Sequence, residues 1–416
     1  MKVLIVTQYF WPESFGITAL ARSMQERGVT VTVLTGQPNY PGGVVFPGYA
    51  AWRTARETFS GVEIMRVPLA PRGIKSGLRL AVNYLSFLVS ASLLGPWMLR
   101  GRQFDAVFVY APSPLLQALP AVLLSWWKRA PLVVWVQDLW PESLSATGFV
   151  RNKRILGLVG SVVRYIYRRT DLILIPSEAF REPVQRLTSS KGRITYYPNA
   201  FVEEPVEAST PSPALSALLA EIAASSSVVF AGNLGTAQSL ETMLDAAERV
   251  AERGHPVRFF IVGSGSLSGW LAEEVARRGL TNVLLPGRFP SSAMMSIYAS
   301  ATALLVSLRD EPIFAQTIPS KVQGYLAAGK PIIASLNGEG ARVVVEAKAG
   351  VACPAGDSEA LAEAVVHICR LDDDARREMG ENGRRYAEKH FALAGLTDDL
   401  IARFEALSAQ RRESSR

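Results

Sequence analysis

Short runs of β-branched and other apolar residues alternate along the chain with longer segments that have helical periodicity. The apolar runs span residues 2–7, 31–35, 62–67, 105–110, 131–136 and 171–176 in the first half, and 227–232, 257–263, 282–287, 302–307, 331–335 and 350–353 in the second. Continuous apolar runs of this length are typical of parallel strands with helices on both faces. The pattern predicts an α/β protein with two Rossmann-like, doubly wound sheets in tandem.

Residues 197–217, YPNAFVEEPVEASTPSPALSA, separate the two series of runs and lack a regular period. Their content of Pro, Ser, Ala and Glu indicates a linker. A chain of 416 residues also exceeds the size at which one hydrophobic core stops growing. We therefore expect an N-terminal domain over 1–199 and a C-terminal domain over 200–391, facing a central cleft. Ligands are expected in the loops at the carboxyl ends of the strands.

One helical segment is apolar enough to suggest contact with a membrane. Residues 78–99, LRLAVNYLSFLVSASLLGPWML, are long enough to span a bilayer. They are flanked by the basic residues Arg72, Lys75, Arg79, Arg100 and Arg102. Predicted strands of one sheet precede and follow the segment, and a single crossing would place them on opposite sides of the bilayer. An interfacial helix with a basic rim is therefore favoured, and the WWKR stretch at 126–129 indicates a second anchor. A buried helix between the domains is the alternative.

Charge is divided unevenly between the two halves. Residues 1–200 contain 23 Lys and Arg against 10 Asp and Glu, whereas the remainder contains 21 against 27. A basic surface attracts anionic lipids, nucleic acids or phosphorylated ligands. The chain lacks RNP-type aromatic motifs and zinc-finger spacings, so a membrane surface is favoured over nucleic acid. Its two cysteines and three histidines have no metal-ligand spacing, which predicts no metal site and a reducing, cytoplasmic compartment.

Two loops of the first half carry candidate functional residues. QYFWPESFG, after the first run, places Glu13 and Gly16 before a helix start, where backbone N–H groups can hold an anion. An ordinary strand-to-helix turn is the alternative there. QDLWPES, after the fifth run, contains Asp138 and Glu142. A carboxylate at a strand end can accept a proton from an attacking hydroxyl, and we assign this role to Asp138 because Glu142 suits a helix cap.

Strand-end loops of the second half are rich in glycine. They contain the candidate substrate-binding residues Gly232, Asn233, Gly263, Gly265, Gly287 and Arg288. The loop at 261–269 is an incomplete dinucleotide fingerprint, because Ser268 stands where the third glycine is needed and no acidic residue follows at the required distance. These loops predict a site for a single nucleotide.

A helix that starts near Ser320, in TIPSKVQGYLAAGKPII, is the best candidate for a diphosphate site. The helix dipole, backbone N–H groups and the Lys321 ammonium would all act on one group, and Gln323 belongs to the same candidate set. Lysine in a first turn opposes the dipole unless an anion is bound. The alternative is that Ser320 is only a helix cap. Residues Asp372–Asp374 match an Asp-x-Asp metal motif, but they lie at a helix start far from any strand end and are interpreted as a cap.

Six ordered motifs together resemble the retaining glycosyltransferases of family 4, and cover about residues 1–390. They are QYFWPESFG, LTGQPNYPGG, QDLWPES, AGNLGTAQSLETMLDAA, IPSKVQGYLAAGKPII and EGARVVVEAKAGVACPAGDSEALAEAV. Within that family the chain looks most like the bacterial transferases of colanic acid, O-antigen and capsule synthesis, including fucosyl- and N-acetylfucosaminyltransferases. The resemblance implies the GT-B fold, with an acceptor-binding N-domain, a donor-binding C-domain, no cofactor and no catalytic metal. It also implies that a C-terminal segment, about 392–416, packs back onto the N-domain.

The resemblance implies a nucleotide-sugar donor, UDP- or GDP-linked, whose leaving diphosphate is stabilised by Lys321. The basic, aromatic-rich N-domain suits a polyprenyl-diphosphate-linked saccharide acceptor at the inner face of the membrane. The acceptor proton would pass to the leaving phosphate or to Asp138. A sugar-nucleotide 2-epimerase of similar fold and a non-catalytic partner subunit of a transferase are the alternatives.

This chain also departs from the family pattern. Many members carry an arginine and a lysine where it has Asn233 and Gln238, and a pair of glutamates where it has Gln316 and Gly324. Three residues are our candidates for the cations that replace the missing pair, namely Lys321, Arg288 and Arg309.

Overall fold

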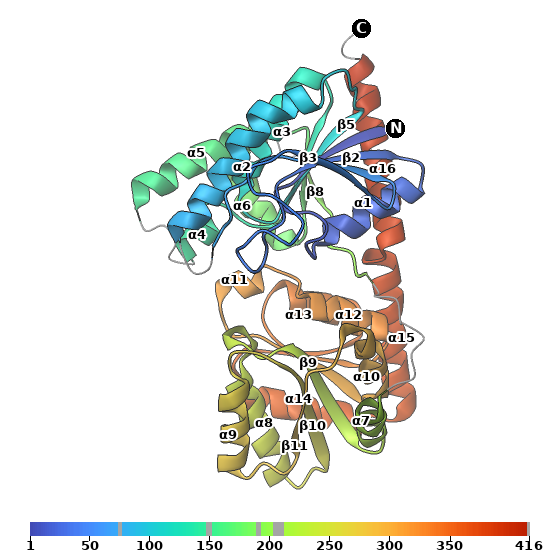
Figure 1. The fold of residues 1–416 in the computed structure, drawn as a ribbon. Coiled ribbons are helices and arrows are strands. Elements are labelled where there is room, and N and C mark those ends of the chain that lie inside the picture. The colour runs from blue at the N-terminus through green and yellow to red at the C-terminus, as the bar shows by residue number, and fades with distance from the viewer. Residues whose placement is uncertain (74–76, 147–151, 189–192, 203–211, 414–416) are drawn as a thin grey trace. The chain divides into compact units, whose positions relative to one another are not determined.

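The computed structural model describes residues 1–73, 77–146, 152–188, 193–202 and 212–413. It divides the chain into two compact units (Figure 1). Unit 1 comprises Met1–Ala200 together with Leu393–Arg416, and unit 2 comprises Phe201–Ala392. Each unit is built around its own twisted sheet, with helices on both faces.

Unit 1 contains an eight-stranded sheet. Its strands lie in the spatial order β3 (Ala55–Phe59), β4 (Val62–Arg66), β2 (Thr30–Thr35), β1 (Lys2–Val6), β5 (Ala106–Ala111), β6 (Leu132–Val136), β7 (Leu172–Ile175) and β8 (Ile194–Tyr196). All neighbours are parallel except β3 and β4, which form an antiparallel pair. The strand order reverses direction between β1 and β5, which is where doubly wound sheets bind ligands. The six apolar runs expected in this half are all strands, whereas β3 and β8 were not expected.

Successive side chains of each strand enter the two cores of unit 1 alternately. Val3 and Ile5 pack with one layer of helices, whereas Leu4 and Val6 pack with the other. The first layer consists of α1 (Gly16–Glu26) and α16 (Leu393–Glu413). The second consists of α2 (Gly77–Met98), α3 (Ala118–Lys128), α5 (Lys153–Arg169) and α6 (Arg181–Leu187), and the short α4 (Glu142–Ala146) follows β6.

The C-terminal helix α16 completes unit 1. Phe404 is fully buried and its ring lies 5.5 Å from that of Phe108 on β5. Thr397 Oγ1 donates a hydrogen bond of 3.0 Å to Ser23 Oγ on α1. The last segment of the chain therefore contributes to the core of the first unit.

Unit 2 contains a six-stranded, wholly parallel sheet. Its strands lie in the order β11 (Val283–Gly287), β10 (Val257–Ser264), β9 (Ser226–Asn233), β12 (Ala303–Ser307), β13 (Ile332–Ser335) and β14 (Gly350–Cys353). One face is covered by α8 (Leu240–Glu252), α9 (Ser268–Arg278) and α14 (Ser358–Arg370). The other is covered by α10 (Met294–Ser300), α12 (Ser320–Ala328) and α13 (Glu339–Glu346), on which α7 (Pro213–Ala223) and α15 (Asp373–His390) pack in turn. The short α11 (Pro312–Ala315) precedes α12.

The expected linker at 197–217 is wrong for residues 213–217, which begin α7. Ser212 caps this helix by accepting a hydrogen bond from the Leu215 N–H, and Pro213 occupies the first helical position. Both are strong helix-start signals, but the surrounding Pro, Ser and Glu content obscured them. Residues 203–211 lie outside the described residues.

Helix α2 corresponds to the apolar segment expected at 78–99. One side packs on the sheet through Phe87 and Ala91, which are fully buried. The other side exposes a stripe with helical spacing, formed by Leu78, Val82, Leu85, Val89, Leu93 and Trp97. Because α2 connects β4 to β5 and packs along the sheet that contains both, it cannot cross a bilayer in this fold. Of the basic residues expected around it, Lys75 lies outside the described residues.

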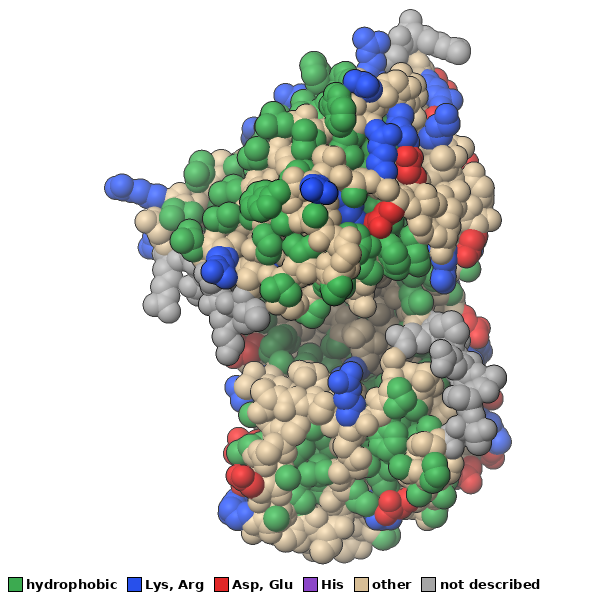
Figure 2. Space-filling model, viewed as in Figure 1, with side chains coloured by type: hydrophobic (Ala, Val, Ile, Leu, Met, Phe, Trp, Pro, Cys, Tyr) green, Lys and Arg blue, Asp and Glu red, His purple; other side chains and the backbone are tan. Residues whose placement is uncertain are grey.

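The exposed stripe of α2 continues onto two neighbouring helices. The additional exposed side chains are Leu123, Trp126 and Trp127 of α3, and Ile155, Leu158 and Tyr165 of α5. Together with the stripe we call them the outer apolar face of unit 1. Figure 2 shows hydrophobic side chains spread over this side of the unit. Only 17% of the most apolar stretch of α2 is buried, so the helix is largely exposed on its own unit, and the alternative of a helix buried between the domains stays a prediction.

Candidate functional site

A cavity of about 420 Å³ lies at the carboxyl ends of β9, β10 and β11 in unit 2. It is lined by Gly232, Asn233, Val262, Gly263, Ser264, Arg288, Phe289, Ser291 and Met294. Four of the residues expected to bind substrate are therefore brought together here, namely Gly232, Asn233, Gly263 and Arg288. Gly287 immediately precedes Arg288, and Gly265 packs against the backbone of Leu234 just beyond the end of β9.

Two glycines allow the strand ends to approach one another closely. Gly232 and Gly263 both have φ of +145°, a conformation that side chains rarely adopt. A Cβ on Gly263 would collide with the carbonyl oxygen of Gly232, and a Cβ on Gly232 would lie 2.5 Å from Lys321 Cε. The glycine pattern thus makes room for the Lys321 side chain to lie directly against the β9 loop.

Lys321 extends from the first turn of α12 into a largely uncharged environment. Its Nζ donates a hydrogen bond of 2.6 Å to Gln238 Oε1 and lies 3.7 Å from the centre of the Phe230 ring. Within the described residues no carboxylate pairs with this ammonium. Burial lowers the pKa of Lys321 to about 7. An anion bound beside Nζ would favour the charged form and raise that pKa again.

The start of α12 is the second feature of this region that could hold an anion. Its N-cap is Pro319, and no side chain caps the first turn. Ser320 is the first helical residue and is exposed, so it does not act as the cap that we considered. Gln323 is buried and lines no part of the cavity. The helix start and Lys321 follow β12, and Gly232 lies at the carboxyl end of β9, so they lie where the strand order of unit 2 reverses.

Arginines lie at two other loops of this region. Arg288 lines the cavity and is exposed. The backbone N–H of Arg309 donates to the carbonyl of Ala237, next to Gln238. In the part of the chain that the structure describes, neither guanidinium forms an ion pair. Both are available to anions.

In unit 1, Asp138 follows β6 and is partly buried. Its carboxylate accepts a hydrogen bond of 3.2 Å from the Trp140 indole. Burial raises the pKa of Asp138, and hydrogen bonds from Ser143, Trp140 and Ser113 partly offset this rise. A carboxylate with a raised pKa is a better proton acceptor near neutral pH. Glu142 lies in the first turn of α4, as expected for a residue near a helix start.

Glu13 occupies a different environment from the one expected. The residue is only 3% exposed, and its carboxylate accepts hydrogen bonds from the backbone N–H groups of Asn39, Tyr40 and Phe10. It therefore fixes two strand-end loops to each other rather than facing solvent, and we leave it out of the proposed substrate contacts. Gly16 is exposed at the first position of α1, with open space around it.

An aromatic group near these loops was not identified from the sequence. The rings of Tyr9 and Phe15 stack at 5.2 Å, Tyr40 lies 5.1 Å from Phe15, and the Arg72 guanidinium lies 5.0 Å above the Tyr40 ring. Tyr84 of α2 lies near Arg72 and Asp138, and burial raises its pKa. In the sequence these residues share only their position shortly after strands. Aromatic residues are frequent there in ordinary cores, so this position did not indicate a site.

Asp372 accepts a hydrogen bond from the Ala375 N–H and caps α15. The acidic triplet thus acts as a helix cap in this structure. Asp373 and Asp374 pair with arginines one turn further along the same helix.

Family models match both units of this chain. Residues 16–200 match the glycosyl transferase 4-like domain, and residues 225–370 match the glycosyl transferases group 1 model. The chain belongs to the family of glycosyltransferases that these two domain models describe. The enzyme has the GT-B fold, since the structure of Anabaena Alr3699/HepE in complex with UDP and glucose matches with a TM-score of 0.63, at 17% identity over 98% of this chain and 100% of that one.

Curated relatives of this glycosyltransferase belong to bacterial polysaccharide synthesis. It is 26% identical over 308 residues to the Pseudomonas aeruginosa protein named "Probable glycosyltransferase WbjE", covering 73% of this chain and 75% of that protein. It is 23% identical over 417 residues to O-antigen chain mannosyltransferase C of Escherichia coli, covering 98% and 99%. The glycosyltransferase is therefore of the polysaccharide-synthesis kind.

Proposed function

We propose that this glycosyltransferase moves a sugar, with retention of anomeric configuration, from a UDP- or GDP-linked donor to a polyprenyl-diphosphate-linked saccharide. The product would be an intermediate of a bacterial surface polysaccharide such as an O-antigen or capsule. The observation that carries the proposal is the partly buried Lys321 ammonium, which has no carboxylate partner in the described residues and lies against the Gly232 loop. The HepE structure holds UDP and glucose, which supports a nucleotide-sugar donor for this chain.

The proposed donor site uses the uncapped start of α12. The diphosphate would accept hydrogen bonds from the first backbone N–H groups of that helix and from Lys321 Nζ, while the nucleoside extends into the cavity lined by Asn233 and Arg288. When the glycosyl bond breaks, negative charge develops on the leaving diphosphate. Fixed donors stabilise that charge more effectively than water does, because they need no reorganisation.

We further propose that Lys321 supplies a cation that the β9 loop lacks. Many family members carry a lysine at the position of Gln238, and here the Gln238 side chain accepts a hydrogen bond from Lys321 Nζ. The positive charge would thus occupy the same place but come from another element. Arg288 or Arg309 would take the part of the arginine that is replaced by Asn233.

For the acceptor we propose the carboxyl-end loops of unit 1. The acceptor hydroxyl would give its proton to the leaving phosphate or to Asp138, whose raised pKa suits this role. The outer apolar face would bring the enzyme to the cytoplasmic side of the inner membrane, where a lipid-linked saccharide is found. An exposed apolar helix with flanking cations is typical of interfacial binding.

The test is a transfer assay with purified protein, bacterial membranes and a panel of UDP-, GDP- and dTDP-sugars. We expect one donor to give a lipid-extractable product, and Lys321→Met to abolish most of the transfer. Lys330→Met is the matched control, because Lys330 follows the C-cap residue Gly329 at the opposite end of α12 and is also partly buried. Conversion of a UDP-sugar without any acceptor, or equal losses in both variants, would contradict the proposal.

A further inference from the structure

A second cavity, of about 560 Å³, lies in unit 1 at the amino ends of the strands. It is lined by helices α3 and α5, by the segments before β7 and β8, and by the end of α16. Asp138 and the other proposed acceptor residues lie at the carboxyl ends of the same strands. This cavity therefore belongs to a different edge of the sheet.

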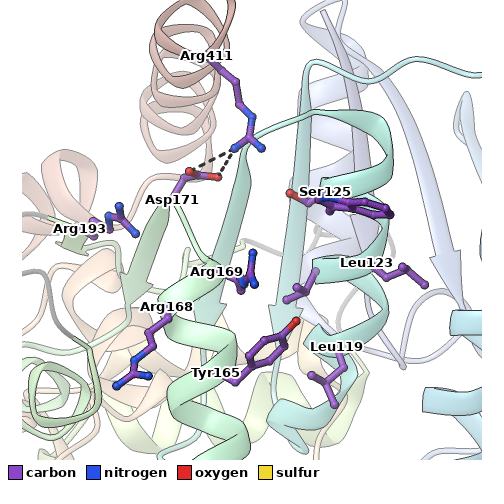
Figure 3. Close-up of a pocket in the computed structure, with 11 residues that line it drawn as sticks. Leu119, Leu123, Ser125, Tyr165, Arg168, Arg169, Asp171, Arg193 and Arg411 are labelled. Atoms are coloured by element: carbon purple, nitrogen blue, oxygen red, sulfur yellow. Dashed lines mark hydrogen bonds and ion pairs between the residues drawn. The ribbon is translucent and has the colours of Figure 1, made fainter. Parts of the chain in front are cut away.

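Positive charge is in excess in this cavity (Figure 3). Its one carboxylate, Asp171, already accepts hydrogen bonds from Arg411 at 3.2 and 3.4 Å and from the Leu132 N–H at 2.8 Å. Among the described residues no carboxylate pairs with Arg168, Arg169 or Arg193. Arg193 donates a hydrogen bond of 3.2 Å to the Thr170 carbonyl. Three guanidinium groups without a counter-charge make an anion site, and the planar fork of arginine suits phosphate.

The rim of this cavity is apolar and aromatic. Trp126 is 71% exposed, and the Arg169 guanidinium lies 5.6 Å from the centre of the exposed Tyr165 ring. Leu123 and Trp126 also belong to the outer apolar face, so the cavity opens directly onto it. Trp and Tyr beside arginine are typical of the level at which lipid headgroups meet acyl chains. A free inorganic anion would gain nothing from this apolar rim.

We infer that the cavity binds the phosphate headgroup of an anionic membrane phospholipid, whose acyl chains continue over Leu123 and Trp126. The inference rests on the proposed membrane-facing function of unit 1 and adds a lipid site to it. Because the site lies at the opposite edge from Asp138, the bound lipid would orient the enzyme on the bilayer and take no part in transfer. The site would make the enzyme prefer membranes with anionic lipids more strongly than non-specific electrostatic attraction alone does.

The test compares two double variants with the same change in charge. Arg168→Gln/Arg169→Gln removes two arginines of the cavity, and Arg154→Gln/Arg164→Gln removes two exposed arginines elsewhere on α5. We measure binding to phosphatidylcholine vesicles with and without phosphatidylglycerol. Each basic residue near an anionic surface contributes about a factor of five, so general charge attraction limits the loss of binding to phosphatidylglycerol vesicles to roughly 30-fold for either pair, and the cavity variant should lose more than this because it also loses the site. The control pair should lose clearly less.

A soluble probe separates a lipid site from diffuse attraction or from a free-anion site. Short-chain phosphatidylglycerol, added without vesicles, should change the fluorescence of Trp126, with Trp126→Phe as the reference. The cavity variant should abolish the change. Equal losses in both arginine pairs, or inorganic phosphate competing as well as the lipid, would overturn the inference.

Failure of the inference can be told from failure of the proposed function. Transfer to a detergent-solubilised acceptor should be the same in the wild type and both arginine variants, and a selective loss in the cavity variant would overturn an orienting role. If the wild-type enzyme binds no vesicle of either composition, the membrane-facing function itself is contradicted and the lipid site with it. If it binds vesicles but shows no preference for phosphatidylglycerol, only the lipid site is contradicted.

Discussion

Six strands of unit 1, in the order β4-β2-β1-β5-β6-β7, follow the same order as the six strands of unit 2, but the units differ in what covers equivalent helices. In unit 2 the helices after the third and fourth strands, α10 and α12, are covered by α7 and α15. In unit 1 no described element forms a further layer over the equivalent helices, α2 and α3, and they expose the outer apolar face. The same fold therefore forms both with and without an outer layer of helices over these two positions.

This difference shows that the exposed apolar surface is not a requirement of the fold. Large apolar patches on a folded protein usually mark an interaction site. The stripe from Leu78 to Trp97 follows the spacing of a helix face and is bounded by cations, a pattern that fits a membrane surface. Unit 2, whose equivalent layer is covered, would then serve the donor chemistry.

Arginine pairing differs between helices α8 and α9 of unit 2 and helix α5 of unit 1. In unit 2, Arg249 and Arg253 both pair with Glu359, and Arg278 contacts Asp245 and Glu274. Along α5 of unit 1, by contrast, Arg168 and Arg169 have no carboxylate partner in the described residues. Paired charges neutralise a surface, whereas unpaired ones attract anions. The comparison predicts that substitutions in unit 2 damage the chemistry and that those on the outer face of unit 1 damage only membrane binding.

The largest effect is expected from Lys321→Met in unit 2. Removing one preorganised donor from a developing negative charge costs about 100- to 1,000-fold in rate, so kcat/KM should fall by that factor. The loss should be the same in detergent and with membranes, because it concerns the donor. Steady-state kinetics with Lys330→Met as control measures it. A loss of kcat/KM that appears only with membranes would contradict the proposal that unit 2 serves the donor chemistry and unit 1 the membrane binding.

The next largest effect is expected from Leu85→Ser/Val89→Ser/Leu93→Ser on the outer face of unit 1. These side chains are about half exposed or more, so their loss should leave the core intact. If each contributes about 1 kcal/mol on entering the interface, vesicle partitioning should fall roughly 100-fold. Transfer to a water-soluble acceptor should not change. Val345→Ser on α13 of unit 2, also exposed, is the control and should leave vesicle binding unaltered.

A smaller, pH-dependent effect should again be confined to unit 2. Because the pKa of Lys321 is lowered to about 7, raising the pH above 7 removes its charge in the free enzyme. The donor kcat/KM should then fall about tenfold per pH unit, since this parameter reports free-enzyme pKa values. Lys321→Arg should remove the fall at alkaline pH, because a guanidinium stays charged. If kcat/KM of Lys321→Arg still falls above pH 7 as in the wild type, the fall is caused by the titration of another group.

The smallest effect is expected on stability. The lowered pKa of Lys321 means that the folded state binds fewer protons than the unfolded state between about pH 7 and 10.5. The free energy of unfolding should therefore rise with pH across that window. Below pH 7 the full destabilisation by the buried, charged Lys321 should be present. Lys321→Met removes the free-energy cost of burying the charged ammonium. The Tm of this variant near pH 6.5 should therefore be at least that of the wild type, and up to about 2–4 °C higher. Differential scanning calorimetry measures this, and a large drop would indicate a structural role.

The strands could be predicted where burial on both faces leaves a continuous apolar run. Strand β3, ARETF, lacks such a run because it is an edge strand with alternate side chains exposed. Strand β8 has only three residues, which is too short for any period. Edge position and short length remove the hydrophobic signal on which the prediction depends.

The candidate site could be predicted only as separate loops. Glycines after β9 and β10 and a lysine at a helix start are visible in the sequence, but the contact between Lys321 and Gln238 joins residues 83 positions apart. The arginines before β8 and in α16 meet in one cavity only through the fold, and no sequence pattern indicates that cavity. Glu13 shows the opposite error, because a carboxylate that looked available is enclosed by backbone N–H groups.

Calorimetric titration with UDP and GDP at pH 8, in two buffers of different ionisation enthalpy, tests the central claim most directly. At that pH Lys321 is mostly neutral in the free protein, since its pKa is about 7. Binding of the diphosphate beside Nζ should recharge it, so we predict uptake of about one proton per nucleotide bound. Lys321→Met should bind more weakly and take up none. Equal affinity in the variant, with the same proton uptake as the wild type, would show that the diphosphate is not bound at Lys321.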